Sequence, residues 1–203
     1  MSGVWFIGDL HFGHKKVSEI RGFSSTSEHD DHIIKKWRKT VRPEDYVHIL
    51  GDLSGGSNSG EVAALDILSE LPGTKHLIAG NHDSISSIHR TKSPNTQRFR
   101  DVFDRISDFS RIRMNHQMIL MSHYPYLSQG DGPGRGHARY EQYRLPDLGE
   151  LLIHAHTHHI HPTSGSRTRR ELCVSWDAWG RMVGLGDIYN WMSTRNIILG
   201  AAL

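Results

Sequence analysis

Residues able to bind a metal ion recur in five short clusters along the chain. The clusters are Asp9 with His11; Asp52; Asn81, His82 and Asp83; His123; and His156 with His158. Imidazole, carboxylate and amide groups together suit manganese, iron, zinc or nickel better than a metal that selects thiolates. The chain has 16 histidines and one cysteine, which favours the same kind of ligand. The series therefore predicts a metal centre with nitrogen and oxygen ligands.

The spacing within the clusters has a simple structural interpretation. Asp9 and His11 are two residues apart, as are His156 and His158, so an extended backbone would place each pair on one face. A glycine directly precedes three of the clusters, at positions 8, 51 and 80, where a tight turn or a close backbone contact is useful. A single cluster arises easily by coincidence, but all five in order do not. We therefore interpret them as parts of one site.

Each cluster follows a short apolar stretch with the length of a buried β-strand. These five strands are predicted at Val4–Ile7, Tyr46–Leu50, Lys75–Ala79, Met118–Met121 and Leu151–Ile153. In an open α/β sheet, binding sites form beyond the carboxyl ends of the strands. The five clusters can therefore converge on one crevice, although they are far apart in the sequence.

The remaining segments supply further strands and three helices. Additional strands are predicted at Glu171–Trp176, at Arg181–Leu185 and at Ser110–Met114, the last pairing with Gln117–Met121 as a hairpin across Asn115 and His116. The predicted helices are one capped by Ser27 that carries Ile33, Ile34, Trp37 and Val41, a second at Glu61–Leu71 and a third from about Asp187 to Arg195. Strands that alternate with helices and then follow one another indicate an α/β domain with mixed sheets.

Length, charge and composition restrict the class of protein. The 203 residues fit one domain spanning 1–203, with a core that needs no disulfide. A single cysteine and the absence of a signal-peptide pattern favour a cytoplasmic location. No apolar stretch is long enough to span a membrane. A net charge of +2 is too small to indicate a nucleic-acid partner, and the oligomeric state is left open.

The order of the clusters resembles that of the calcineurin-like metallophosphoesterase superfamily. The resemblance covers about residues 4 to 185, and the stretches Asp9–His14 and Pro43–Asp52 are similar to the small bacterial and phage-type members. One departure is Ala155, where the family usually has glycine before the first histidine of its last motif. We expect a slight backbone adjustment without loss of the metal, unless this position requires a positive φ.

The resemblance implies a fold, two metal ions and a role for each site residue. The implied fold is a four-layer α/β/β/α sandwich with two mixed β-sheets. One metal would be held by Asp9, His11 and His158, the other by Asn81, His123 and His156, with Asp52 bridging both. His82 would face the substrate, with Asp83 as its orienting partner. The two ions would be divalent, with manganese expected and iron, zinc or nickel as alternatives.

The implied reaction is hydrolysis of a phosphodiester. Two metals clamp the reacting oxygens and lower the pKa of water, so that hydroxide can attack phosphorus. The expected substrate is a small or nucleotide-like phosphodiester, and the resemblance extends this to 2′,3′-cyclic nucleotides. The alternatives are a phosphomonoesterase or protein phosphatase, a nuclease, and a metal-binding scaffold without catalysis.

Several other residues have both a functional and a purely structural interpretation. His14 either lines the substrate pocket or packs and caps locally, and His154 either supports a ligand or is an ordinary strand residue. Between Tyr124 and Arg144, Arg135 and Arg139 are candidate substrate contacts, or else solvated charges. Trp176 and Trp179 either stack on a base or belong to the core.

Overall fold

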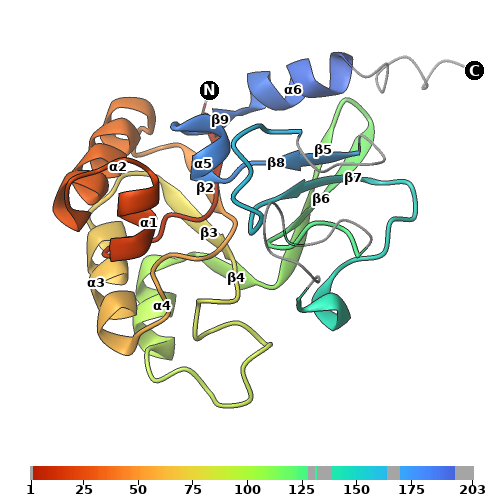
Figure 1. Cartoon of the computed structure of the whole chain (residues 1–203). Helices are drawn as coiled ribbons and strands as arrows, with labels where there is room; N and C mark the ends of the chain where they lie inside the picture. The colour runs from red at the N-terminus through yellow and green to blue at the C-terminus, as the bar shows by residue number, and fades with distance from the viewer. Residues whose placement is uncertain (1, 128–130, 132–138, 164–169, 195–203) are drawn as a thin grey trace, which may run out of the picture.

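The computed structural model describes residues 2–127, 131, 139–163 and 170–194, in which the apolar stretches form two β-sheets (Figure 1). The first sheet has the order β4-β3-β2-β1-β9, from β1 (Val4–Ile7), β2 (Tyr46–Ile49), β3 (Thr74–Ile78), β4 (Arg105–Ser107) and β9 (Val183–Gly184). Its first four strands are parallel, and β9 runs antiparallel to β1. The second sheet has the order β5-β6-β7-β8, from β5 (Phe109–Met114), β6 (Gln117–Ser122), β7 (Leu151–His154) and β8 (Glu171–Cys173). Only β5 and β6 are antiparallel there, so both sheets are mixed.

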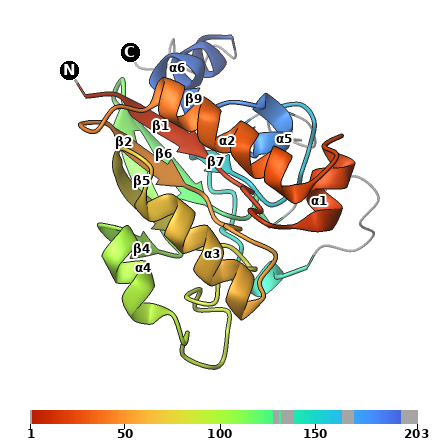
Figure 2. The same ribbon diagram turned by 90° about the vertical axis from the view of Figure 1, so that its left-hand side faces the viewer.

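Helices cover the outer face of the first sheet, as Figure 2 shows. The helices of the described residues are α1 (Lys15–Ile20), α2 (Thr26–Thr40), α3 (Asn58–Ser69), α4 (Thr96–Val102), α5 (Trp176–Trp179) and α6 (Leu185–Ser193), with a 3₁₀ turn η1 (Glu141–Tyr143). The long helix α2 buries Ile33 and Trp37, which are four residues apart and so lie on one face. None of these helices is both long enough and apolar enough to cross a membrane.

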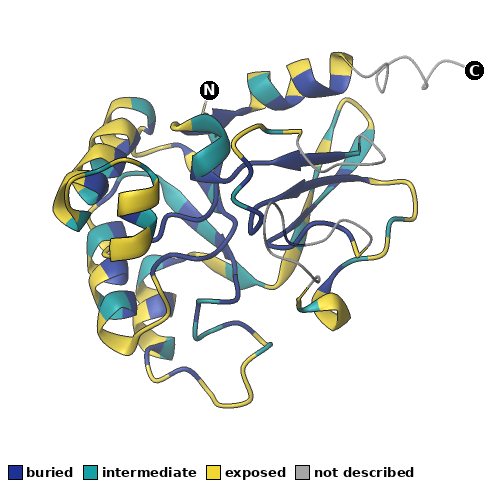
Figure 3. Ribbon diagram, viewed as in Figure 1, coloured by how far each residue is buried: buried dark blue, intermediate teal, exposed yellow. Residues whose placement is uncertain are grey.

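Two apolar cores follow from the alternation of side chains along the strands. Phe6 and Ile7 are adjacent in β1 and point to opposite faces of the sheet. Ile7 belongs to the core between the first sheet and its helices, which includes Trp37 and Leu65. Phe6 belongs to the core between the two sheets, to which Ile153 and the α6 residues Ile188, Trp191 and Met192 also contribute. Figure 3 shows β7 and β8 in dark blue as buried, whereas the edge strand β5 is exposed or half-buried along its length.

The predicted α/β fold with two mixed sheets is confirmed, and the five strands that precede the clusters lie within about one residue of their predicted positions. The hairpin between β5 and β6 is also confirmed. Asn115 and His116 have φ values of 46° and 63°, as a two-residue turn of type I′ requires at both central positions.

Several element boundaries differ from the prediction, mostly because a serine caps the helix at another position. Ser25, and not Ser27, caps α2, and its Oγ accepts a hydrogen bond from the Glu28 amide at 3.1 Å. Ser57 caps α3, so this helix begins before Glu61. The strand predicted to reach Trp176 ends at Cys173, because Ser175 caps the short helix α5.

At the end of the chain, Leu185 opens α6 and does not extend a strand. The helix therefore begins before Asp187, and Arg195 lies outside the described residues. The elements α1, α4, α5, β4 and η1 were not predicted. Each is at most seven residues long, which leaves little room for a periodic pattern.

Candidate metal centre

The carboxyl ends of β1, β2, β3, β6 and β7 meet at one side of the two sheets, and the loops that follow them are hydrogen bonded to one another. The Asp9 amide donates to the Gly51 carbonyl at 3.0 Å, which joins the loops after β1 and β2. The His156 amide donates to Asp9 Oδ2 at 2.9 Å, which joins the loop after β7 to the one after β1. The Ala155 amide donates to the His123 carbonyl at 3.0 Å. The predicted convergence of the five clusters therefore involves both sheets.

The glycines that precede the ligands allow these loops to approach closely. A Cβ atom on Gly51 would lie 2.4 Å from the Gly80 nitrogen, and one on Gly80 would lie 2.4 Å from Asp52 Oδ1. A Cβ on Gly8 would lie 2.5 Å from the Cβ of Ala155. Ala155 does not have a positive φ, so the condition under which it would disturb the site is not met. The methyl group of Ala155 occupies the space that Gly8 leaves.

The extended backbone predicted for the paired ligands is wrong. Asp9 and His11 have φ values of 55° and 51°, and His156 and His158 have 68° and 50°. Each ligand therefore sits in the left-handed region, which costs free energy for a residue other than glycine. The chain turns at each of these four ligands, and this turning brings both members of a pair to the same centre. Such strain is found mainly at functional sites.

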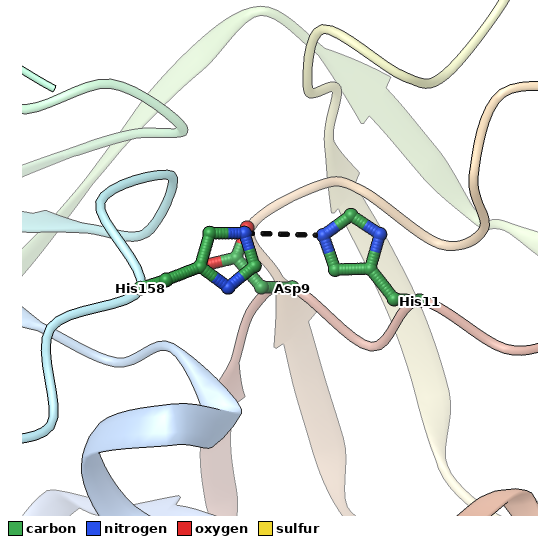
Figure 4. Close-up of side chains that lie close together, drawn as sticks. All are labelled: Asp9, His11 and His158. Carbon is green, nitrogen blue, oxygen red and sulfur yellow. Dashed lines mark hydrogen bonds between the residues drawn. The ribbon is translucent and has the colours of Figure 1, made fainter. Parts of the chain in front are cut away.

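Asp9, His11 and His158 form the first group of ligand atoms (Figure 4). The Nε2 atoms of the two histidines are 3.3 Å apart. His11 Nδ1 lies 3.0 Å from the Ser54 carbonyl oxygen, and His158 Nδ1 lies 2.8 Å from Asp177 Oδ2. Because these oxygens only accept, both Nδ1 atoms carry the proton, and in the neutral rings both Nε2 atoms present a lone pair. Two nitrogens this close need a cation between them. Burial opposes a charge on His158, but Asp9 and Asp177 outweigh burial and raise its pKa, so in the absence of a metal a proton on His158 Nε2 fills that place.

Asp52, His123 and His156 form the second group. His123 Nε2 lies 3.2 Å from His156 Nδ1 and 3.2 Å from Asn81 Oδ1. His123 Nδ1 donates to the Leu50 carbonyl at 2.6 Å, so its Nε2 again presents a lone pair. His156 Nε2 lies 3.4 Å from Asp131 Oδ1, which directs Nδ1 of the same ring toward the ligands. The second group thus repeats the chemistry of the first.

The Asp52 carboxylate lies between the two groups. Its Oδ2 is 3.8 Å from His11 Nε2 and 3.6 Å from His123 Nε2. Burial alone would raise the pKa of Asp52, but the imidazoles of His123 and His11 outweigh burial and lower it. Burial holds the pKa of His11 well below its usual value, which keeps this ligand neutral. A negative group shared by two sets of imidazole ligands is what two divalent cations require.

The first group also contains a buried charge that needs a cation. Asp9 is fully buried, and its Oδ1 has no hydrogen-bond partner among the described residues. Leaving a buried carboxylate oxygen uncompensated is costly. Together with the facing nitrogen lone pairs, this oxygen shows that the residues present fit a metal. Which ligand binds which ion stays a prediction.

His82 and Asp83 are placed differently from each other, and the predicted pairing of the two is wrong. Asp83 Oδ2 accepts from the amides of Asp52 at 3.0 Å and Gly80 at 2.7 Å, and its Oδ1 accepts from Leu53 at 3.0 Å. Both carboxylate oxygens thus tie together the loops after β2 and β3, and neither orients the imidazole. Burial and the nearby Asp52 charge raise the pKa of Asp83 to about 6. His82 is 39 % exposed, with Nε2 4.0 Å from Asp52 Oδ2, so its ring faces the open side of the site.

An arginine whose side chain is only 6 % exposed supports the first group, and it was not identified from the sequence. Arg21 donates two hydrogen bonds to Asp177, at 3.0 and 2.7 Å, and Asp177 in turn accepts from His158. The same guanidinium donates to the Asp9 carbonyl at 2.7 Å. Arg21 therefore fixes the backbone of one ligand and the partner of another. It lies 156 positions from Asp177, so no local spacing connects the two.

Two of the three candidate substrate contacts, His14 and Arg139, lie within the described residues, and both have partners in the protein. His14 caps α1, its Nδ1 accepting from the Val17 amide at 3.3 Å, while its ring lies 5.4 Å from that of His11. Arg139 donates to Asp131 Oδ2 at 2.7 Å, and Arg135 lies outside the described residues. A substrate role for these three side chains stays a prediction.

Of the other residues with two interpretations, His154 and Trp179 have structural contacts, whereas Trp176 both belongs to the first core and lines a cavity beside His158. His154 is buried in β7, and its Nδ1 lies 2.8 Å from the Ala155 carbonyl oxygen. Trp176 belongs to the first core, and Trp179 Nε1 donates to the Cys173 carbonyl at 2.8 Å.

Comparison with known proteins agrees with this geometry. A model of the calcineurin-like phosphoesterase family matches residues 3–159, and the chain belongs to this family. It is 40 % identical over 198 residues to the Gene 66 protein of Mycobacterium phage L5, covering 94 % of each chain. It is 37 % identical over 193 residues to the Gene 66 protein of Mycobacterium phage D29, covering 93 % of this chain and 94 % of that one.

The fold is also found in a solved structure. A protein of unknown function from Aquifex aeolicus has a TM-score of 0.67 at 25 % identity, covering 94 % of this chain and 99 % of that chain. Membership of the family implies metal-dependent hydrolysis of phosphoesters at a centre with two divalent ions. The predicted resemblance is therefore confirmed.

Proposed function

We propose that the protein is a phosphodiesterase that hydrolyses small or nucleotide-like phosphodiesters, with 2′,3′-cyclic nucleotides as candidate substrates and manganese as the favoured metal. The observation that carries the proposal is the position of Asp52 Oδ2, 3.8 Å from His11 Nε2 and 3.6 Å from His123 Nε2. One carboxylate is thereby shared by two sets of ligands. This is the arrangement that supports an in-line displacement at phosphorus.

Each residue has a definite task in this reaction. Asp9, His11 and His158 would hold one ion, Asn81, His123 and His156 the other, and Asp52 would bridge them. When bound, such a pair of divalent ions lowers the pKa of water and neutralises charge on the phosphoryl oxygens. His82 is half-exposed beside Asp52, where its ring can donate a hydrogen bond to a phosphoryl oxygen or a proton to the departing alkoxide. Asp83 and Arg21 keep the ligand loops in place.

Cavities on two sides of the centre favour a diester over a monoester. One cavity, of about 430 Å³, is lined by the ligand His158 and by Phe23 and Trp176. Another, of about 390 Å³, is lined by the ligand Asn81 and by His82. A phosphodiester has two organic arms, so both cavities can be occupied while phosphorus lies at the centre. A monoester would leave one of them empty.

The test compares turnover of an aryl phosphodiester and an aryl phosphomonoester by the purified protein, with added manganese and with a chelator. We expect the diester to be the better substrate by kcat/KM, and the chelator to abolish hydrolysis. A strong preference for the monoester would overturn the choice of substrate and favour a phosphomonoesterase. Hydrolysis unaffected by chelator would overturn the metal-dependent reaction itself.

A nuclease and a non-catalytic scaffold receive less support. A nuclease usually presents a basic surface to the nucleic-acid backbone, and the net charge here is only +2. A scaffold has no use for an imidazole held beside the bridging carboxylate on the open side of the centre, as His82 is. The diesterase therefore accounts for more of the observed geometry.

A further inference from the structure

The cavity beside Asn81 and His82 is continuous with the second group of ligands. Asn81 Oδ1 lies 3.2 Å from His123 Nε2, so this wall of the cavity is itself a candidate ligand. On another side lies Tyr140, whose ring centroid is 6.0 Å from that of His156. A molecule whose phosphoryl group reaches the centre from this side must place its remaining atoms in the cavity.

A buried hydrogen-bond network shapes the loop that forms the far wall. Glu61 is 2 % exposed, and its carboxylate accepts from the Ser84 amide at 2.7 Å and from Asn95 Nδ2 at 2.7 Å. The hydroxyl groups of Ser84 and Ser93 are 2.5 Å apart. Both ends of the segment from 84 to 95 are therefore anchored to α3. The exposed side chains in between, His89 and Lys92, line a cavity of defined shape.

Lys92 contributes an ammonium group to the lining of this cavity, which contains no carboxylate among the described residues. Glu61 is buried beneath the cavity and is not part of its lining, and hydrogen bonds from Ser84 and Asn95 stabilise its carboxylate there. Within the described part of the chain, Lys92 forms no ion pair. The ammonium group is thus available to an anion.

The cavity on the other side of the centre has a different character. There Arg21 and Asp177 lie 2.7 Å apart and neutralise each other, and apart from His32 and His158 the rest of the lining is apolar or glycine, including Phe23 and Trp176. That cavity therefore offers an anionic group no lysine or arginine without a carboxylate partner, whereas an aryl group or base would pack against its apolar side chains. The two sides therefore discriminate between the two ends of a substrate.

We propose that the cavity lined by His82, His89 and Lys92 is a subsite for a second anionic group of the substrate, of the phosphate class. This inference rests on the proposed function and specifies its substrate, a phosphoester that carries a further phosphate on the arm directed toward Lys92. The lysine binds that phosphate as a point charge without taking part in the chemical step.

Binding of two product-like probes to the manganese-loaded protein tests the subsite. The probes are adenosine 3′-monophosphate and adenosine 3′,5′-bisphosphate, measured by isothermal titration calorimetry. We expect Lys92→Met to weaken binding of the bisphosphate by about three- to ten-fold, because an exposed lysine paired with a doubly charged phosphate contributes about that much. Binding of the monophosphate should weaken by less than about two-fold. Lys36→Met, which removes an exposed lysine from α2, is the matched control and should leave both affinities unchanged.

Three results would overturn the subsite. They are equal weakening of both probes by Lys92→Met, no weakening of either, and failure of the wild-type protein to bind either probe. The choice of probes separates this inference from the proposed function. A protein that prefers monoesters in the turnover assay would still show the selective effect of Lys92→Met on the bisphosphate.

Discussion

Three of the four histidines in the metal centre have one ring nitrogen already assigned. The rings of His11, His123 and His158 each direct one nitrogen at a carbonyl or carboxylate oxygen within 3.0 Å. The fourth ring, that of His156, has its Nε2 at 3.4 Å from Asp131 Oδ1, which is a longer charge contact. A hydrogen-bonded partner fixes the tautomer and the orientation of a ligand before any metal arrives. The remaining nitrogens are left with a lone pair directed at the centre.

A pair of variants separates metal binding from catalysis at the residue scale. Asp52→Asn removes the bridging charge, so we expect the protein to lose at least one of two metals and its activity together. His82→Ala should keep both metals while kcat falls by about 10²–10⁴-fold, the range for a lost general acid. Metal content by inductively coupled plasma mass spectrometry and steady-state kinetics check both. Two tightly bound metals in Asp52→Asn would refute the bridging role.

The contact between Arg21 and Asp177 gives a second prediction at this scale. Arg21→Met or Asp177→Asn should weaken the metal of the first group by about 10–100-fold, the effect of losing a group that orients a ligand. The second group should keep its metal, so the stoichiometry falls toward one per chain. Arg181→Met is the matched control, because Arg181 forms a similar pair with Asp187 at 2.8 Å on the surface. Loss of both metals, or of neither, would contradict this assignment.

At the scale of elements, the loops that follow the strands both terminate the strands and position the ligands. Their left-handed conformations direct the side chains toward the centre at Asp9, His11, Asp52, His156 and His158. The turns are compatible with the packing because small residues lie where the loops cross. Gly8 and Ala155 show this most clearly, since they join the end of β1 to the end of β7 across the two sheets.

The contact between Gly8 and Ala155 is testable by a double-mutant cycle. Gly8→Ala alone would bring two Cβ atoms to 2.5 Å, so we expect it to destabilise the protein by about 1–3 kcal/mol, the cost of overpacking. Ala155→Gly should cost about 1 kcal/mol or less, and in the double variant it should relieve most of the clash. Urea unfolding of the four proteins measures the coupling. Additive effects would show that the two positions do not share this space.

At the scale of the whole molecule, burial of histidines away from the centre couples folding to pH. His48 stacks on Phe6 with ring centroids 5.3 Å apart, and its Nδ1 is buried with no partner in the described part of the chain. Burial lowers the pKa of His48 to about 4, against an ordinary value of 6.5. The unfolded chain therefore binds more protons between these two values. The contribution of His48 to stability is complete above pH 6.5 and is lost as the pH falls toward about 4.

This coupling predicts the effect of removing the imidazole. In the presence of chelator, the free energy of unfolding of wild type should fall as the pH is lowered from 6.5, by up to about 1.4 kcal/mol per pH unit from this one group. His48→Leu should fall less steeply over the same window, whereas His161→Leu, which changes an exposed histidine, should match wild type. Urea unfolding at several pH values provides the slopes. An unchanged slope in His48→Leu would exclude His48 as the source.

The sequence by itself determined the five strands that precede the clusters and the identity of the candidate ligands. An apolar stretch followed by Asp9 and His11, or by Asn81 and His82, is a local pattern, and local patterns are readable without a structure. It did not determine the conformation of the ligands, because the left-handed turns depend on contacts between loops. It also paired Asp83 with the wrong partner, since adjacency in the chain does not say that the amides of Asp52, Leu53 and Gly80 surround that carboxylate.

Only the tertiary structure decided what surrounds the centre. Arg21 supports both Asp9 and Asp177, although 156 positions separate it from the latter. The opposite character of the two flanking cavities is likewise absent from any stretch of sequence, since Lys92 and Tyr140 come from different loops. The physical reason is the same in each case. The type of each ligand is set by a single residue, whereas charge compensation, backbone strain and cavity shape depend on several residues that only the fold brings together.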